Sequence, residues 1–259
     1  MKIVTWNVDW YRNGRRSGKY WEYLEVDSSS DVYEKIKNVI VKFLSEDSEN
    51  MVCLQEVPYK VGEKNRNHDL YNEMLNKDFN FNKGTFKANR MNIWAYARTM
   101  VISQDEWKNS DNEYCGEKRN HVIQIEKNQV RIMALHIPPI QMPKKDGKGV
   151  EDVEGASVNW NLWKNIIDQC KKSKPQIVLG DFNADDSQTE QFERLQELMK
   201  LGYCEPDGDA RSKPTFNDKT HIDYILVRND LKARVKSYKV FEKGKGLSDH
   251  EPLIIDIDI

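Results

Sequence analysis

Short apolar runs alternate with amphipathic segments along most of the chain. The runs have the length and composition of buried β-strands and predict strands at residues 2–6, 50–54, 130–135, 176–179, 222–227 and 252–259. Two further strands are expected at residues 93–103 and 120–126, and the second would form a hairpin with residues 130–136. Because a hairpin joins antiparallel strands, its presence predicts mixed rather than purely parallel sheets.

Between the strands, apolar residues recur with helical spacing. In the first such segment, Val32, Ile36, Val39, Ile40 and Phe43 share one helical face. The pattern predicts helices at residues 31–44, 68–75, 158–170 and 189–201. A doubly wound nucleotide-binding fold would show the same alternation, but no glycine-rich phosphate loop follows any strand, so we set that fold aside.

The composition is typical of a folded protein, and the sequence shows no obvious domain boundary. The chain has 259 residues, of which 38% are hydrophobic and 32% charged, and no stretch resembles a linker, so we predict a single domain over residues 1–259. The amino terminus lacks the features of a signal peptide, and no apolar run is long enough to span a bilayer. We therefore expect a cytoplasmic monomer that does not insert into membranes.

Polar residues that could take part in catalysis or metal binding lie at the ends of the predicted strands. They are Asn7, Glu56, His136, Asp181, Asn183, Asp223, Asp249 and His250. Residues far apart in sequence would therefore meet at one edge of the sheets.

Gly180 to Asn183 leave a buried strand together. Gly180 permits a tight exit, and Asp181 and Asn183, two positions apart, project to the same side. An aspartate in that position can hold or deprotonate a water, while the asparagine amide donates to a phosphoryl oxygen. An Asx turn that merely closes the strand explains the segment equally well.

The other strand ends add a metal ligand and two histidines. Glu56 offers a hard oxygen ligand that suits Mg²⁺ or Mn²⁺ rather than zinc. His250 has Asp223 as a plausible carboxylate partner, and two prolines hold His136 at a strand end. Each motif alone has an ordinary structural explanation, but together they indicate a metal-dependent phosphoester hydrolase.

Five short motifs carry a resemblance to a known family. They are Trp6-Asn7, Gln55-Glu56, Gly180-Asp181-Phe182-Asn183, Ile222-Asp223-Tyr224 and Ser248-Asp249-His250. In this order they resemble the endonuclease/exonuclease/phosphatase superfamily, which includes deoxyribonuclease I. The resemblance implies an α+β fold, a four-layer α/β/β/α sandwich in which two mixed β-sheets pack face to face with helices outside.

The resemblance also implies roles for the matching positions. Glu56 would be the principal ligand of Mg²⁺, for which Mn²⁺ could substitute, with Asn7 and Asp249 supporting the metal or the phosphate. Asp181 would orient the attacking water, and Asn183 would bind the phosphoryl oxygens. His250 paired with Asp223 would act as an acid or base, or would stabilise the transition state.

Within the superfamily, Ala134-Leu135-His136 followed by Pro138 looks most like the deoxyribonuclease I branch. There His136 would face the scissile phosphate, and Arg119 would contact the phosphate. Apurinic endonucleases place a tyrosine where His136 stands, so abasic-site repair is disfavoured. Residues 93–103 contain no acid that could pair with His136, so its partner is left open.

Substrate choice rests on one basic segment. Arginine and lysine alternate with aromatic residues in a predicted loop made of Trp10, Tyr11, Arg12, Arg15, Arg16, Lys19, Tyr20 and Trp21. Cations and aromatics of this kind hold phosphates and stack bases, which favours DNA or RNA; a solvated loop packed on the domain is equally consistent. A small phosphorylated metabolite or lipid headgroup is the alternative, favoured by the net charge of -2. A catalytically inactive binding module is the third hypothesis.

Overall fold

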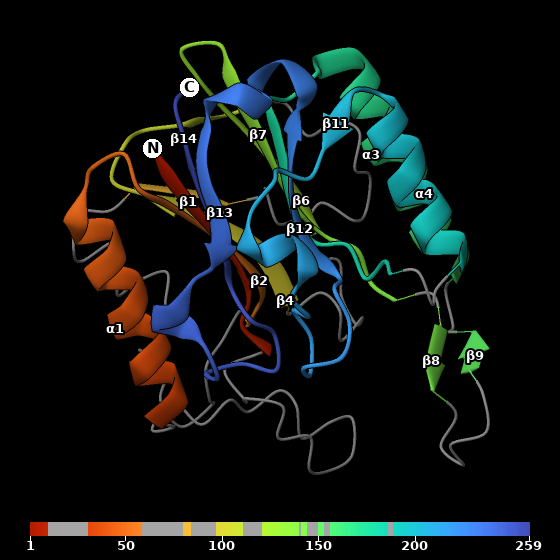
Figure 1. Ribbon diagram of the computed structural model, residues 1–259, viewed down its shortest axis with the longest axis horizontal. Coiled ribbons are helices and arrows are strands. Elements are labelled where there is room, and N and C mark those ends of the chain that lie inside the picture. Colours follow the sequence, from red (N-terminus) through yellow and green to blue (C-terminus); the bar gives the residue numbers. More distant parts are fainter. Residues whose placement is uncertain are drawn as a thin grey trace.

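The computed structural model describes residues 1–9, 31–58, 80–83, 97–110, 121–139, 141–143, 150–152, 156–185 and 189–259 (Figure 1). Helix 68–75 of the prediction and the basic segment at residues 10–21 lie outside these ranges. Within them, no helix is long and apolar enough to cross a membrane.

Two six-stranded sheets form the centre of the described structure. The first has the order β13 (Val235–Val240), β14 (Leu253–Ile257), β1 (Lys2–Asn7), β2 (Met51–Pro58), β4 (Ala97–Ser103) and β3 (Asn80–Lys83). The second has the order β11 (Tyr203–Cys204), β12 (Asp223–Arg228), β10 (Ile177–Asp181), β7 (Val130–His136), β6 (Val122–Lys127) and β5 (Lys108–Asn109). A separate two-stranded sheet pairs β8 (Gln141–Pro143) with β9 (Val150–Asp152).

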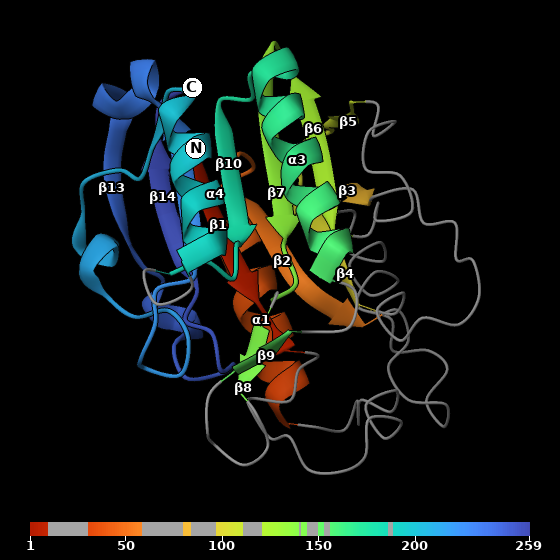
Figure 2. The same cartoon turned by 90° about the vertical axis from the view of Figure 1, so that its right-hand side faces the viewer.

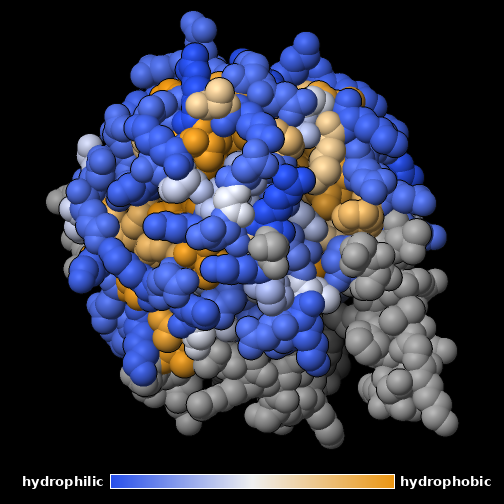
Figure 3. Space-filling model, in the orientation of Figure 1, coloured by the Kyte–Doolittle hydropathy of each residue, from blue (hydrophilic) through white to orange (hydrophobic). Residues whose placement is uncertain are grey.

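Helices cover the outer faces of the two sheets. Helix α1 (Asp31–Glu46) lies beside the first sheet, and α3 (Ala156–Ser173) and α4 (Thr189–Lys200) lie against the second (Figures 1 and 2). Three short 3₁₀ helices, Asp209–Ser212, Asn229–Arg234 and Glu242–Gly244, connect the later strands. The face in Figure 3 is mainly hydrophilic, with smaller apolar areas. The described layers are helix, sheet, sheet and helix, as predicted.

Strand alternation fills three hydrophobic layers. Val4 and Trp6 of β1 pack toward α1, whereas Ile3 between them packs toward the second sheet. On the opposite face of the second sheet, Trp163 of α3 and Leu195 of α4 pack against the strands. Because successive side chains point to opposite faces of a strand, each central strand is apolar on both sides. This explains why these strands appear in the sequence as continuous apolar runs.

The sheets are mixed, as the predicted hairpin required. Strands β1 and β2 are parallel, as are β7 and β10, while the other pairs are antiparallel. The hairpin between β6 and β7 turns at Asn128 and Gln129, which have φ values of 50° and 68°. Two left-handed residues form the two-residue turn whose twist suits a hairpin. The antiparallel partner β12 begins at Asp223, where the parallel strands β7 and β10 end.

Candidate active site

Strand register brings three predicted residues side by side on the second sheet. Asp181, the last residue of β10, pairs with His136 on β7 and with Asp223 on β12. All three side chains are buried, and Asp181 is fully so. An imidazole and two carboxylates therefore lie in one row across the ends of three neighbouring strands of the second sheet.

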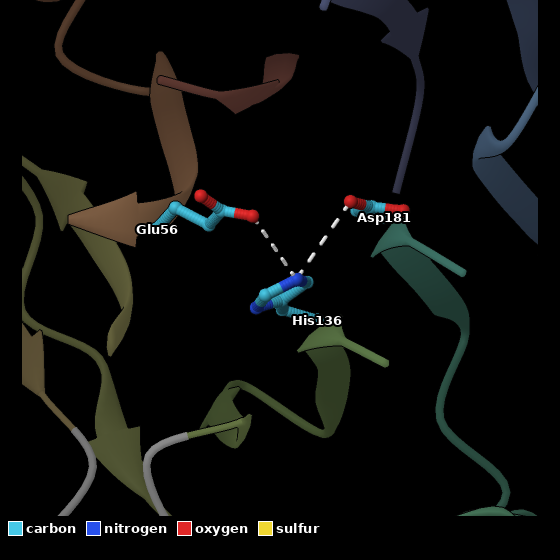
Figure 4. Close-up of side chains that lie close together, drawn as sticks. All are labelled: Glu56, His136 and Asp181. Atoms are coloured by element: carbon cyan, nitrogen blue, oxygen red, sulfur yellow. Dashed lines mark ion pairs between the residues drawn. The ribbon is translucent and has the colours of Figure 1, made fainter. Parts of the chain in front are cut away.

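Glu56 reaches this row from the first sheet through a β-bulge. The pairing of β2 with β4 shifts between Leu54 and Val57, and Glu56 has a φ of 54°. Cys53 faces the second sheet, and Leu54 faces α1. Without the bulge, Glu56 would face α1 like Leu54, since the two are two positions apart. The bulge instead directs its carboxylate toward His136, as Figure 4 shows.

Asn7 connects the carboxylates of the two sheets. Its Nδ2 atom donates to Asp181 Oδ2 at 2.9 Å and to Glu56 Oε1 at 3.3 Å. Its Oδ1 atom accepts the Asp9 backbone N–H at 3.0 Å, and its backbone oxygen accepts the Ser248 hydroxyl at 2.8 Å. The amide thereby fixes the relative positions of two acids that belong to different sheets.

His250 is held by Asp223. Its Nδ1 atom lies 2.9 Å from Asp223 Oδ2, while Nε2 lies 4.0 Å from both Asp181 Oδ2 and Asp249 Oδ1. The Phe216 ring packs on the imidazole with centroids 4.7 Å apart. The Nε2 atom is therefore directed toward Asp181. Asp249 lies on the His250 side of the site.

Asn183 completes a tight turn after β10. Its backbone N–H donates to Asp181 Oδ1 at 2.8 Å, its φ is 47°, and its Nδ2 atom donates to the Ile137 carbonyl at 2.9 Å. The Asx turn considered as a structural explanation is therefore present. The turn also holds Oδ1 of Asp181 in place. The other oxygen, Oδ2, accepts the hydrogen bond from Asn7 and faces His136 and His250.

Burial and neighbouring charges shift three pKa values. Burial, followed by the nearby charge of Asp223, raises the pKa of Asp181 to about 8. Burial alone would lower the pKa of His250, but the charge of Asp223 and the hydrogen bond to it raise the pKa to about 10. Burial lowers the pKa of His136, although the charge of Glu56 opposes this. The site thus holds a carboxyl whose pKa is raised beside an imidazole whose cationic form is favoured.

Two overlapping groups have the donor atoms of a metal site. Glu56, His136 and Asp181 place one donor atom each within 4.8 Å of one another, and so do Asp181, Asp223 and His250. Carboxylate oxygens suit hard divalent cations, and imidazole suits transition ions. The residues present therefore fit a divalent cation.

Sequence reasoning left the carboxylate partner of His136 open, and the structure places two beside it. Glu56 Oε1 lies 3.5 Å and Asp181 Oδ2 3.8 Å from His136 Nε2. Both acids were already candidates for other roles, and they lie on β2 and β10 rather than in residues 93–103. Arg119 lies outside the described residues.

Thr215 supports the site without having been predicted. Its buried hydroxyl oxygen accepts the backbone N–H groups of Ile222 and Asp223, each at 3.1 Å. A lone threonine in a polar stretch gives no signal of this, because the contact depends on how the chain folds back between residues 215 and 223.

Two mixed sheets between helices, with polar residues gathered at one end, define a deoxyribonuclease I-like sandwich with a site for phosphoester chemistry. The sequence matches the model of the Endonuclease/Exonuclease/phosphatase family over residues 4–250, so the chain belongs to that family. It is accordingly a metal-dependent phosphoester hydrolase.

Solved structures with this fold cover the whole chain. A 3′ phosphatase, NExo from Neisseria, bound to a product DNA hairpin, matches with a TM-score of 0.66 at 14% identity, covering 100% of both chains. An AP endonuclease from Archaeoglobus fulgidus matches with a TM-score of 0.65 at 14% identity, again over 100% of both chains. An endonuclease/exonuclease/phosphatase family protein from Leptotrichia buccalis gives 0.60 at 19% identity over 100% of both chains. No curated protein matches the sequence. At these identities the likeness is one of fold.

Proposed function

We propose that the protein hydrolyses phosphodiester bonds in DNA or RNA, using a divalent cation, Mg²⁺ or Mn²⁺, held at Glu56. The observation that carries the proposal is the meeting of Asn7, Glu56, His136, Asp181, Asp223 and His250 in one cluster, in which every residue but Glu56 is buried. Asn7 and Asp249 support the cation or the phosphate. When bound, the cation offsets negative charge on the phosphate.

Asp181 is the residue that receives a proton from the attacking water. A general base works best when its pKa is near the operating pH. Burial raises the pKa of the Asp181 carboxyl to about 8, so its proton-accepting form increases as the pH rises toward that value. Its Oδ1 atom is held by the Asn183 N–H and its Oδ2 atom by Asn7, so the carboxylate has a fixed direction. The water oxygen forms a bond to phosphorus as Asp181 takes one of its protons. The bond from phosphorus to the leaving oxygen breaks, and that oxygen gains a proton from solvent.

Cationic and amide donors stabilise the charge that develops on the phosphoryl oxygens. His250 is protonated at neutral pH because Asp223 holds its Nδ1 atom, so its Nε2–H is a donor. His136 and the remaining N–H of the Asn183 amide add further donors at the same edge, and Arg119 contributes a phosphate contact. Donors fixed in position before the reaction need little reorganisation as charge moves.

Nucleic acid is the proposed substrate class. The names of relatives with this fold describe a 3′ phosphatase bound to a DNA hairpin, an AP endonuclease and the endonuclease domain of a telomere-specific retrotransposon. The basic, aromatic segment at residues 10–21 supports the same class. A small phosphoester is the second candidate, because a net charge of -2 disfavours tight binding of a polyanion.

Turnover assays separate these candidates. The purified protein is incubated with bis(p-nitrophenyl) phosphate, p-nitrophenyl phosphate, plasmid DNA, single-stranded DNA and RNA, with Mg²⁺, Mn²⁺ or a chelator. We expect metal-dependent cleavage of the diester and of at least one nucleic acid. Turnover of only the monoester would support the small-phosphoester function. No turnover of any substrate would support the inactive binding module.

Substitutions test the proposed roles. Asp181→Asn and His250→Ala are each expected to lower kcat by about 10² to 10⁴, because a proton acceptor or a charge-stabilising donor is lost. Glu56→Gln should mainly raise the cation concentration needed for half-maximal activity. Asp168→Asn is the matched control, since Asp168 is exposed on α3 and paired with Lys164. Near-normal turnover by Asp181→Asn would contradict the assignment.

A further inference from the structure

The His136 imidazole faces two carboxylates without bonding to either. Its Nε2 atom lies 3.5 Å from Glu56 Oε1 and 3.8 Å from Asp181 Oδ2, beyond the range of about 2.7 to 3.2 Å for a good hydrogen bond. The ring makes no hydrogen bond to any residue that the structure describes, although only 4% of the side chain is exposed. A buried imidazole normally has a partner.

The spacing of these three donor atoms suits a shared ion. Two ligands bonded at about 2.1 to 2.2 Å to one ion lie about 3.0 Å apart at octahedral angles and about 3.5 Å apart at tetrahedral angles. The two measured separations, 3.5 and 3.8 Å, are within about 1 Å of both values, and all three atoms lie within 4.8 Å of one another. Figure 4 shows the carboxylates of Glu56 and Asp181 both directed toward the same ring nitrogen of His136, so the three donor atoms face one point.

Asn7 fixes both carboxylate oxygens that face this point. Its Nδ2 atom donates to Asp181 Oδ2 and Glu56 Oε1, the same two atoms that lie nearest His136. A carboxylate oxygen can accept a hydrogen bond and bind a cation at once, since it has two lone pairs. Outer hydrogen bonds of this kind orient metal ligands.

We propose that Glu56, Asp181 and His136 bind one divalent transition-metal ion, with His136 Nε2 as a direct ligand. The inference deepens the proposed function, because this ion occupies the proposed hydrolytic site, and it gives His136 Nε2 a ligand role in place of the donor role stated there, since a nitrogen bonded to the ion carries no proton. Mg²⁺ favours oxygen ligands, whereas imidazole nitrogen binds first-row transition ions well. The nitrogen ligand makes the site select Mn²⁺ or Co²⁺ over Mg²⁺.

Calorimetric titration of the chelator-treated full chain tests this selectivity. We expect Mn²⁺ to bind at least about tenfold more tightly than Mg²⁺. His136→Ala should weaken Mn²⁺ binding by about tenfold or more and change Mg²⁺ binding by less than about threefold, because only the transition ion depends on the nitrogen. Equal affinities for the two ions in the unchanged protein, or unaltered Mn²⁺ affinity in His136→Ala, would overturn the proposal.

Pulsed electron paramagnetic resonance of the Mn²⁺-loaded protein tests the bond itself. A directly bound imidazole couples its nitrogen to the Mn²⁺ electron spin, and labelling all histidines with ¹⁵N should change that coupling. The labelled unchanged protein provides this test even if His136→Ala fails to fold. Absence of nitrogen coupling in the unchanged protein would overturn the proposal.

Matched variants assign the coupling to one histidine. The coupling should disappear in His136→Ala and persist in His221→Gln, since His221 binds Glu205 outside the cluster. Persistence in His136→Ala would point to His250, whose Nε2 atom lies 4.0 Å from Asp181, and would overturn the assignment.

The two proposals fail in different ways. Mg²⁺-dependent hydrolysis without nitrogen coupling would overturn the ligand role of His136 and leave the hydrolase function standing. Nitrogen coupling from His136 without hydrolysis of any phosphoester would overturn the proposed function and leave the metal site standing.

Discussion

At the scale of single residues, a partly buried histidine lies outside the candidate site, with an acceptor at each ring nitrogen. His221 Nε2 is 2.9 Å from Glu205 Oε1, and its Nδ1 is 2.7 Å from the Lys213 carbonyl oxygen. The Tyr238 hydroxyl donates to the same Glu205 oxygen at 2.8 Å. Since both ring nitrogens face acceptors, the imidazole is held in its protonated form. Burial by itself would lower the pKa of His221, but the hydrogen bond to Glu205 and its charge raise it.

This histidine predicts a pH dependence of stability. Because the folded pKa of His221 is above that of the unfolded chain, about 6.5, its contribution is complete below that pH. The contribution is lost as pH rises through the folded pKa. His221→Gln should therefore lower the free energy of unfolding by about 1–3 kcal/mol at pH 6, and the difference from the unchanged protein should shrink at alkaline pH. Urea unfolding at a series of pH values measures it, and a difference independent of pH would contradict the account.

Sequence reasoning named residues that the structure brings together, but it did not predict how they face one another. Asn7, Asp181 and His250 each flank an apolar strand, which is a local signal. The left-handed conformation of Glu56 and the two hydrogen bonds from Asn7 depend on a bulge and on how two sheets meet. Such contacts join residues as much as 174 positions apart, so no local pattern encodes them.

At the scale of elements, Gly180 allows β10 to lie close to β7. Its φ is 140°, and a Cβ atom there would lie 1.8 Å from the Leu135 backbone oxygen. Backbone cannot move aside as a flexible side chain can, so the two parallel strands would have to separate. Asp181 and His136, which are paired at the ends of these strands, would move with them.

Gly180→Ala should therefore lower both stability and turnover. We expect a loss of about 3 kcal/mol or more in the free energy of unfolding, from strain in a packed sheet. Gly202→Ala is the control, because Gly202 also has a positive φ, 98°, but no atom lies within 4 Å of its added Cβ. That control should cost about 1 kcal/mol. Denaturant unfolding and diester turnover measure both variants, and equal losses would show that close approach of the strands is unimportant.

Central strands were predicted better than edge strands. The apolar runs of β1, β2, β7, β10, β12 and β14 were recognised because both faces are buried. Edge strand β13 was missed, since only Tyr238 and Val240 of its six residues are buried and polar residues separate them. The two-residue strands β5 and β11 are too short to show any period. Their pairing is decided by neighbours distant in sequence.

At the scale of the whole molecule, one hydrophobic layer belongs to both sheets. Ile3 and Ile255 from the first sheet and Leu179 and Ile225 from the second are fully buried in the same cluster. If the two sheets separated, the inner faces of both would be exposed to water. The single domain expected from length and composition stays a prediction, and this shared layer is the physical reason to expect it.

Leu179→Ala tests whether the two sheets unfold together. Removing a fully buried leucine side chain from the shared layer should lower the free energy of unfolding by about 2–5 kcal/mol. If the chain unfolds as one unit, hydrogen exchange should accelerate equally in peptides from β1 and β14 and in peptides from β7 and β10. Faster exchange confined to the second sheet would mean that the sheets unfold separately. The candidate site takes Asn7 and Glu56 from one sheet and His136 and Asp181 from the other. If the sheets unfolded separately, unfolding of one sheet would therefore disrupt the site, and it would require less free energy than unfolding of the whole protein.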